Sequence, residues 1–180
     1  MQRTLIRLMF LPDSRWTVSP AIAVAILVAA TSAASAANLV KTFRDWSLFS
    51  HEEAQKKICF AASQPKESSP VDSKRDAVFF YISAWPKDGV KSEVSIRLGY
   101  PIKKGSTVTV DIGGAKFDLF AKDDKAFVAD PTQELKLIDA MKRGTIMKVE
   151  ATSEKGTATA DNYSLMGISN ALQGLASECP

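Results

Sequence analysis

The sequence predicts a mainly β, single-domain protein with an antiparallel, sandwich-like sheet and two amphipathic helices. The first observation is a hairpin pattern, in which residues 106–112 and 115–119 alternate apolar and polar side chains around Gly113-Gly114. Two glycines permit the positive φ angles of a type I′ turn, whose twist matches that of the flanking strands. The second observation is that further runs of strand length recur along the chain, whereas helical spacing is confined to residues 131–143 and 165–179.

If the hairpin loop consists of the two glycines alone, the register of its strands follows. Apolar residues then share one face of the hairpin and polar residues share the other. The expected pairs are Ile112 with Ala115, Val110 with Phe117, Val108 with Leu119, Thr109 with Asp118, and Asp111 with Lys116. We expect this hairpin to lie at the centre of the sheet.

Residues 1–37 have the layout of a cleaved secretory signal peptide, which leaves residues 38–180 as a single mature domain. An arginine-containing segment precedes the apolar run 21–30, and Ala34-Ser35-Ala36 fits the small-x-small cleavage rule. The alternative is a membrane anchor, but the apolar run is about half the roughly 20 residues that a spanning helix needs. Because this segment carries three arginines and Asp13, its removal lowers the net charge from +3 to +1. Such a balance does not favour nucleic acid as a partner.

The first part of the mature chain contains two predicted strands, residues 43–49 and 58–62. Residues 50–57 between them are polar and predict a loop or a hairpin connection. Residues 64–76 combine proline, serine and charge without periodicity, which indicates an exposed loop.

Residues 77–85 form a nearly continuous apolar and aromatic run that ends at Pro86. This pattern is typical of a central strand covered on both faces. Phe79, Tyr81 and Trp85 fall on one face of the run, and we interpret them as core residues rather than as a binding platform.

Two shorter strand patterns follow. Residues 93–98 alternate apolar and polar side chains, which predicts a strand with one solvent-exposed face. Residues 126–129 predict a short strand after the turn at Asp123-Asp124.

The next segment predicts a helix over residues 131–143. Asp130 is a suitable N-cap, Pro131 suits the first helical position, and Gln133 completes a capping-box spacing. Gly144 should end the helix as its C′ residue. The apolar residues expected to pack on the sheet are Leu135, Ile138 and Met141.

The chain is expected to end with a second hairpin and a second helix. Residues 145–152 and 157–165 flank a turn at 154–156, with a loop of two or three residues. The C-terminal helix over residues 165–179 has apolar residues at steps of three and four. They are Leu165, Ile168, Leu172, Leu175 and Cys179.

The mature chain contains two cysteines, Cys59 and Cys179. In an oxidising compartment, an even pair in a small exported domain predicts a structural disulfide. Two buried free thiols are the alternative. A redox-active pair is less expected, because catalytic cysteines usually lie close together as C-x-x-C.

Groups that carry catalytic or metal chemistry are scarce, so we expect no catalytic, cofactor-binding or metal-binding residues. His51 is the only histidine, and it lies in the predicted connection 50–57 with no serine in a G-x-S-x-G elbow nearby. Asp123, Asp124 and Asp130 are close in sequence but lack the spacing of a calcium loop. Turn and cap roles account for all three.

The remaining candidates for a functional site are basic loops. If these loops share one side of the sheet, they could bind an anionic partner such as lipid head groups, polysaccharide or an acidic protein. The alternative is ordinary solubilising charge. The candidate residues are Lys103, Lys104, Lys87, Lys91, Lys74 and Arg75.

An ordered set of short motifs resembles the invasion-associated locus B family of exported α-proteobacterial proteins. The set spans most of the mature chain and includes Cys59-Phe60, Trp85-Pro86-Lys87-Asp88-Gly89, Gly99-Tyr100-Pro101, Lys103-Lys104-Gly105 and Tyr163-Ser164-Leu165. The resemblance implies a periplasmic or outer-membrane-associated protein, or a secreted one, with some relatives linked to virulence through entry into host cells. It implies no enzymatic activity and assigns no functional residues.

The leading functional hypothesis is therefore an exported, non-enzymatic cell-envelope protein that binds a protein or an envelope or host-surface component. One alternative is an envelope hydrolase that acts on peptidoglycan or polysaccharide, which requires a cleft with two facing carboxylates. Another is a structural or chaperone-like role, in which an exposed sheet edge or the C-terminal helix docks on a partner. We expect no membrane span in the mature chain.

Overall fold

The computed structural model describes residues 37–53, 56–71 and 74–180. Within them, eleven strands form one antiparallel sheet in the order β1-β2-β3-β5-β6-β9-β8-β7-β10-β11-β4. The strands are β1 (Asn38–Phe43), β2 (Trp46–Glu53), β3 (Lys56–Ser63), β4 (Glu67–Ser69), β5 (Phe79–Trp85), β6 (Val90–Arg97), β7 (Thr107–Ile112), β8 (Ala115–Lys122), β9 (Lys125–Phe127), β10 (Ile146–Thr152) and β11 (Ala158–Ser164). The predicted signal peptide falls outside the described residues, apart from Ala37.

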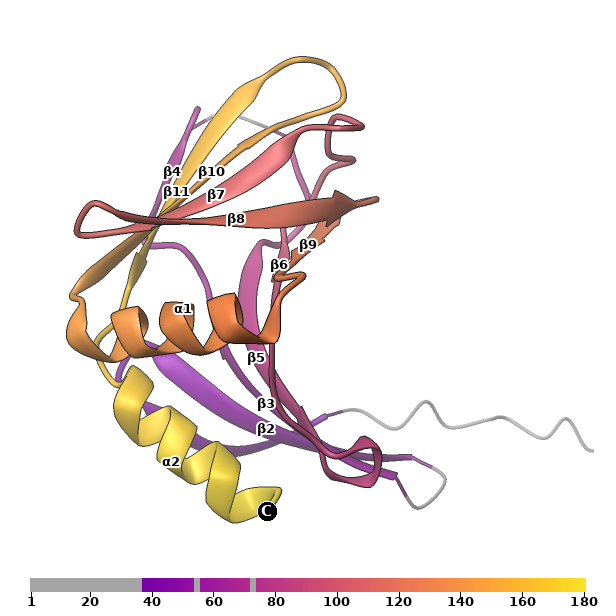
Figure 1. Ribbon diagram of the computed structural model, residues 1–180, viewed down its shortest axis with the longest axis vertical. Helices are drawn as coiled ribbons and strands as arrows, with labels where there is room; N and C mark the ends of the chain where they lie inside the picture. The colour runs from indigo at the N-terminus through magenta and orange to yellow at the C-terminus, as the bar shows by residue number, and fades with distance from the viewer. Residues whose placement is uncertain (1–36, 54–55, 72–73) are drawn as a thin grey trace, which may run out of the picture. The chain divides into compact units, whose positions relative to one another are not determined.

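Two helices, α1 (Pro131–Arg143) and α2 (Ile168–Glu178), lie together along one side of the sheet (Figure 1). The mainly β fold with two helices is therefore confirmed. The sheet also curves back on itself, because the rings of Phe80 on β5 and Tyr163 on β11 lie 5.9 Å apart. The indole Nε1 of Trp46 donates a hydrogen bond to the carbonyl of Ser164 at 3.0 Å. The core thus lies between the two halves of the sheet and beneath the helices.

The register of the central hairpin is confirmed. β7 and β8 pair Ile112 with Ala115, Val110 with Phe117 and Asp111 with Lys116, with both turn glycines at positive φ. Asp111 accepts the N–H of Gly114 at 2.8 Å, so its carboxylate stabilises the turn.

Helix α1 has the predicted bounds, and Asp130 accepts the N–H groups of Thr132 and Gln133. The prediction that Leu135 faces the core is wrong, because its side chain is 61% exposed. At 100° per residue, Leu135 lies about 120° around the helix from Met141, whereas Leu137 lies close to Met141 on the buried face. Glu134 also turns inward, where it accepts the N–H of Val94 at 3.1 Å and burial raises its pKa.

Five other features differ from the predictions. The expected strand 43–49 is divided by a turn at residues 44–45, and β2 continues through the expected connection to Glu53. The loop 64–76 contains the short strand β4, which pairs with β11. The second hairpin is joined by residues 153–157 rather than by two or three residues, and α2 begins only at Ile168.

The disulfide expected between Cys59 and Cys179 is present and joins β3 to the residue that follows α2. Beside it, the ammonium group of Lys57 contacts the carboxylate of Glu178 at 2.7 Å. The C-terminal end of α2 is therefore attached to the sheet covalently and electrostatically.

The expectation that β5 is covered on both faces is wrong. Phe80, Ile82 and Ala84 are buried in the core, but Phe79, Tyr81 and Trp85 on the other face are only partly buried. No helix or strand among the described residues covers this outer face.

Candidate functional site

A cavity of about 950 Å³ opens at one end of the sheet. Three segments surround it, namely residues 74–76, residues 99–101 and the β10–β11 connection 153–157. Its lining combines basic, acidic, hydroxyl and aromatic groups, unlike the apolar core below.

The floor of this cavity rests on a buried ion pair between Arg75 and Asp161. Asp161 on β11 is fully buried, and the Arg75 side chain is 7% exposed. The guanidinium binds both carboxylate oxygens, with Nη1 at 2.9 Å from Oδ2, and Ser68 donates to Oδ1 at 2.6 Å. The hydrogen bonds that Arg75 donates to Asp161 raise the pKa of Arg75. Because the pair is satisfied in this way, it anchors the 74–76 segment and β4 to β11.

Tyr100 forms part of the wall beside this pair. The Arg75 guanidinium lies 5.9 Å from the centre of its ring, and its hydroxyl shares a hydrogen bond with Thr159. Burial raises the pKa of Tyr100, so its hydroxyl stays neutral at physiological pH. Tyr100 therefore contributes a neutral, hydrogen-bonded side chain to the wall.

Gly99 allows residues 74–78 to approach the wall. Its φ is +73°, and a Cβ atom there would lie 2.2 Å from the carbonyl oxygen of Asp76. The N–H of Asp76 in turn donates to the carbonyl of Gly99 at 2.9 Å. A larger residue would disturb both the local backbone and the Arg75 segment.

We predict that Gly99→Ala lowers the free energy of unfolding by about 2–3 kcal/mol, because left-handed strain and a backbone clash add together. Urea unfolding measures the loss. Gly105→Ala is the matched control, since Gly105 has φ +72° and no atom within 4 Å of an added Cβ. It should lose only about 1 kcal/mol. Equal losses would contradict the proposed close contact at Gly99.

Four lysines lie on the segments at this end of the sheet, and we call them the lysine rim: Lys74, Lys103, Lys104 and Lys155. Lys74 and Lys155 line the cavity directly. The loop with Lys103 and Lys104 is bonded to the β10–β11 connection, because Lys103 donates its N–H to Thr152 and Glu154 donates its N–H to Pro101. Among the described residues, none of the four ammonium groups has an ion-pair partner.

Two carboxylates, Asp76 and Glu154, also line this cavity, so the lysine rim is in excess over the nearby acids. The Asp76 carboxylate lies 3.8 Å from the guanidinium of Arg97.

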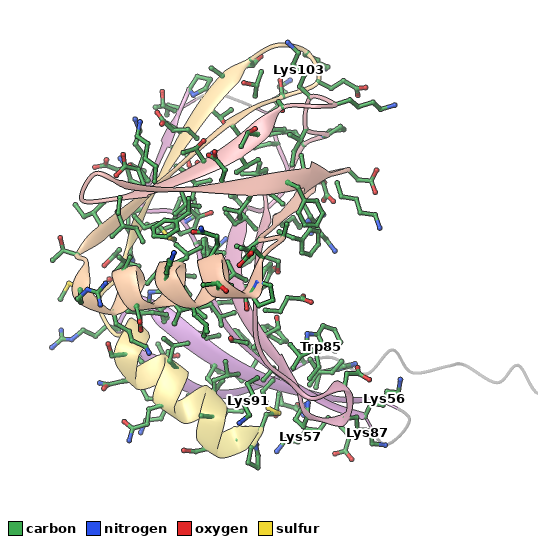
Figure 2. All side chains as sticks on the ribbon, in the orientation of Figure 1. Lys56, Lys57, Trp85, Lys87, Lys91 and Lys103 are labelled. Atoms are coloured by element: carbon green, nitrogen blue, oxygen red, sulfur yellow. A yellow bond between two sulfur atoms is a disulfide. The ribbon has the colours of Figure 1, made fainter. Side chains whose placement is uncertain are left out.

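Of the six predicted basic residues, the structure brings Lys74, Arg75, Lys103 and Lys104 to the same end of the sheet. Arg75 is not a surface cation, since its charge is committed to Asp161. Lys87 and Lys91 lie at the opposite end from Lys103, near Lys56 and Lys57 (Figure 2).

Positive charge at that opposite end is partly balanced by neighbouring acids, although Lys56, Lys87 and Lys91 form no ion pair among the described residues. Lys57 pairs with Glu178, β2 places Glu52 opposite Lys57, and Asp88 follows Lys87 in the chain. The two ends therefore differ in that only the end with Lys74 and Lys155 adjoins the cavity of about 950 Å³, although both contain several lysines.

The residues considered for catalysis or metal binding lie in ordinary structural positions. His51 lies within β2 opposite Ile58 and not in a loop, because β2 extends to Glu53. Asp124 pairs with Arg97 at 3.0 Å, and Asp130 caps α1. In the part of the chain that the structure describes, no three His, Cys, Asp or Glu residues are grouped to hold a metal ion.

Sequence reasoning missed Asp161 and Lys155. The available signal for Asp161 was its alternation with Thr159 and Tyr163, which puts a carboxylate on the inward face of a strand. A buried carboxylate needs a cationic partner. The sequence does not indicate which cation pairs with Asp161, because Arg75 lies 86 residues away.

Among the described residues, no helix combines the length and the apolar character needed to cross a bilayer.

Comparison with known proteins gives two matches of different kinds. Residues 46–176 match the family described as invasion associated locus B (IalB) protein. The crystal structure of invasion associated protein B from Bartonella henselae superposes with a TM-score of 0.55 at 21% identity. The match covers 80% of this chain and 98% of that chain, which shows a shared fold. A search of curated proteins gives no significant match.

Proposed function

Since the chain belongs to the invasion associated locus B family, we propose that it is an exported, non-enzymatic binding protein of the cell envelope whose lysine rim receives an anionic partner. The observation that carries this proposal is the group of four lysines without ion-pair partners among the described residues, around a cavity of about 950 Å³. The partner is a protein or an envelope or host-surface component with exposed negative charge. Nucleic acid is not expected at this location.

Export is supported by two features. A disulfide between Cys59 and Cys179 persists in oxidising compartments and is rare in the cytosol of most bacteria. The first strand begins at Asn38, directly after the expected signal peptide 1–37, so cleavage there leaves every described strand within residues 38–180. We place the mature domain in the periplasm, at the outer membrane or outside the cell.

Binding is favoured over hydrolysis by the state of the carboxylates. A glycosidase-type pair needs one carboxyl group held protonated beside a free carboxylate. Asp161 is held by Arg75 and Ser68 beneath the cavity, and the Asp76 side chain is 81% exposed. Neither environment suits a general acid.

Strand addition at the β1 edge of the sheet is also disfavoured. The edge strand β1 carries Lys41 and has a register irregularity between Leu39 and Lys41. Charged residues and bulges are the usual means by which edge strands resist pairing.

Docking through the C-terminal helix is disfavoured as well. The apolar face of α2, with Ile168, Ala171 and Leu175, is buried within the domain.

The test compares two charge reversals. We predict that Lys103→Glu/Lys104→Glu lowers co-sedimentation of the purified protein with envelope fractions by about tenfold, or ~1.4 kcal/mol. The reason is the loss of two unpaired cations beside the cavity, and the wild-type interaction should weaken as salt rises.

The matched control is Lys87→Glu/Lys91→Glu, which makes the same change in net charge at the opposite end (Figure 2). It should bind nearly as well as the wild type. The proposal fails if both double variants bind like the wild type, or if both lose binding equally.

A further inference from the structure

A second hollow lies on the outer face of the sheet, away from the core and the helices. Its volume is about 480 Å³, within the range of small-ligand sites. It is lined by Ala37 and by residues of β2, β3, β5, β6 and β9, most of which face outward and alternate with the core residues of the same strands. Figure 2 places Trp85 on the side of the strands away from α2.

Aromatic rings cross this face in a row. Phe49 stacks on Phe60 with ring centres 5.1 Å apart, and Phe60 meets the edge of Tyr81 at 5.9 Å. On the far side, Phe127 stacks on Phe120 at 5.6 Å. These rings hold one another in place, so the walls of the hollow are preorganised.

The row is interrupted where β6 contributes a small residue. Ser95 pairs with Tyr81 on one side and with Phe127 on the other. Tyr81 and Phe127 are thus two strands apart, or about 10 Å, because neighbouring strands lie about 4.8 Å apart. A gap of that width between two aromatic side chains accommodates one flat ring. We call this gap, lined also by Phe60, Ser83 and Trp85, the aromatic hollow.

Hydrogen-bonding groups border the aromatic hollow. Glu93 and Arg97 flank Ser95 on β6, and both line the hollow. The indole Nε1 of Trp85 is buried yet has no hydrogen-bond partner in the described part of the chain. Because this N–H is shielded from solvent, Trp85 lines the hollow with its ring rather than with its donor.

These features together select the ligand chemistry. A hydrocarbon chain would satisfy the aromatic walls but would offer no hydrogen-bond partner to Glu93, Ser95 and Arg97, which also line the hollow. A sugar ring has an apolar C–H face and a rim of hydroxyl groups, which matches aromatic walls with polar groups at their edges. We propose that the aromatic hollow binds one neutral sugar ring of a glycan.

The test uses neutral monosaccharides and trisaccharides of glucose, galactose and N-acetylglucosamine, titrated to millimolar concentrations against the ¹⁵N-labelled protein. The indole N–H signal of Trp85 should shift saturably with at least one of these sugars. The indole of Trp46 should not shift, because its N–H is bonded to Ser164 in the core. Trp46 therefore reports that the fold is intact in every sample.

Two variants separate the site from its surroundings. Ser95→Leu fills the aromatic hollow and should weaken sugar binding by at least about tenfold, or ~1.4 kcal/mol. Leu135→Ala removes an exposed apolar side chain from helix α1, far from the hollow lining, and should leave affinity unchanged. Lys103→Glu/Lys104→Glu should also bind sugar normally, which keeps this test separate from that of the lysine rim.

Three outcomes would overturn the proposal. One is that no sugar shifts the Trp85 signal, and a second is that Ser95→Leu binds sugar as well as the wild type. The third is that decanoate, used as an acyl-chain probe, shifts Trp85 whereas the sugars do not.

Discussion

Replacing Asp161 with asparagine should lower the free energy of unfolding by about 3–5 kcal/mol. The carboxylate is fully buried and bound to Arg75, whose side chain is 7% exposed. An amide at this position leaves the guanidinium inside the domain without a counter-charge. The loss should be greatest for the segment that carries Arg75, because the ion pair is its main attachment to β11. Urea unfolding monitored by circular dichroism measures the change.

The control for this prediction is Asp139→Asn, which makes the same chemical change in an exposed ion pair. Asp139 and Lys142 lie 3.5 Å apart on the surface of α1. Its loss should be below about 0.5 kcal/mol, since exposed pairs contribute little. Adding Arg75→Gln to Asp161→Asn should recover part of the stability, because the unpaired charge is then removed. Similar small losses for Asp161→Asn and Asp139→Asn would refute the role of the buried pair.

Removing the disulfide should cost about 2–5 kcal/mol, with the upper value set by the chain-entropy account of a long closed loop. Cys59 and Cys179 are 120 residues apart in sequence and hold the end of α2 against β3. In Cys59→Ala/Cys179→Ala, the unfolded chain regains the freedom of that loop. The amides of α2 should also exchange with solvent faster, because Lys57–Glu178 is then the main link at its C-terminal end. Urea unfolding and hydrogen exchange measure the two effects.

A reductant provides the control for the disulfide. Unfolding the wild type in urea with dithiothreitol should reproduce the lower stability of the double variant, while the reductant should leave the variant itself unchanged. If the variant unfolds at the same urea concentration as the oxidised wild type, the disulfide does not stabilise this fold.

Features set by neighbouring residues were predictable from the sequence. The β7–β8 register follows from Gly113-Gly114 and the alternation on either side, since a shift of one residue would exchange the two faces. The start of α1 follows from Asp130 and Pro131, which act on the first helical turn alone.

The end of α1 was predicted at Gly144 and is found there, but its cause is a contact with a distant segment. Gly144 is not left-handed, and a Cβ atom there would lie 2.5 Å from the Ile112 side chain.

Features that depend on distant segments were not predictable. Leu135 fits the helical spacing as well as Leu137 does, and only the position of the sheet decides which of them is buried. Phe79, Tyr81 and Trp85 belong to a strongly apolar run, yet no described helix or strand lies over them. Hydrophobicity indicates that a side chain can be buried, but whether it is buried depends on what packs against it.

The candidate sites show the same division. The sequence by itself determined the mainly β fold class, the central hairpin, the family resemblance and the residue types available for binding, because each depends on local pattern or motif order. Only the tertiary structure decided that Arg75 is neutralised by Asp161, that Lys103 lies far from Lys87, and that Ser95 leaves a gap between Tyr81 and Phe127. Those relations arise from the order of strands in the sheet, where β6 lies beside β9 and β11 beside β4. Such pairings join residues distant in sequence, and no local pattern encodes which strand becomes the neighbour.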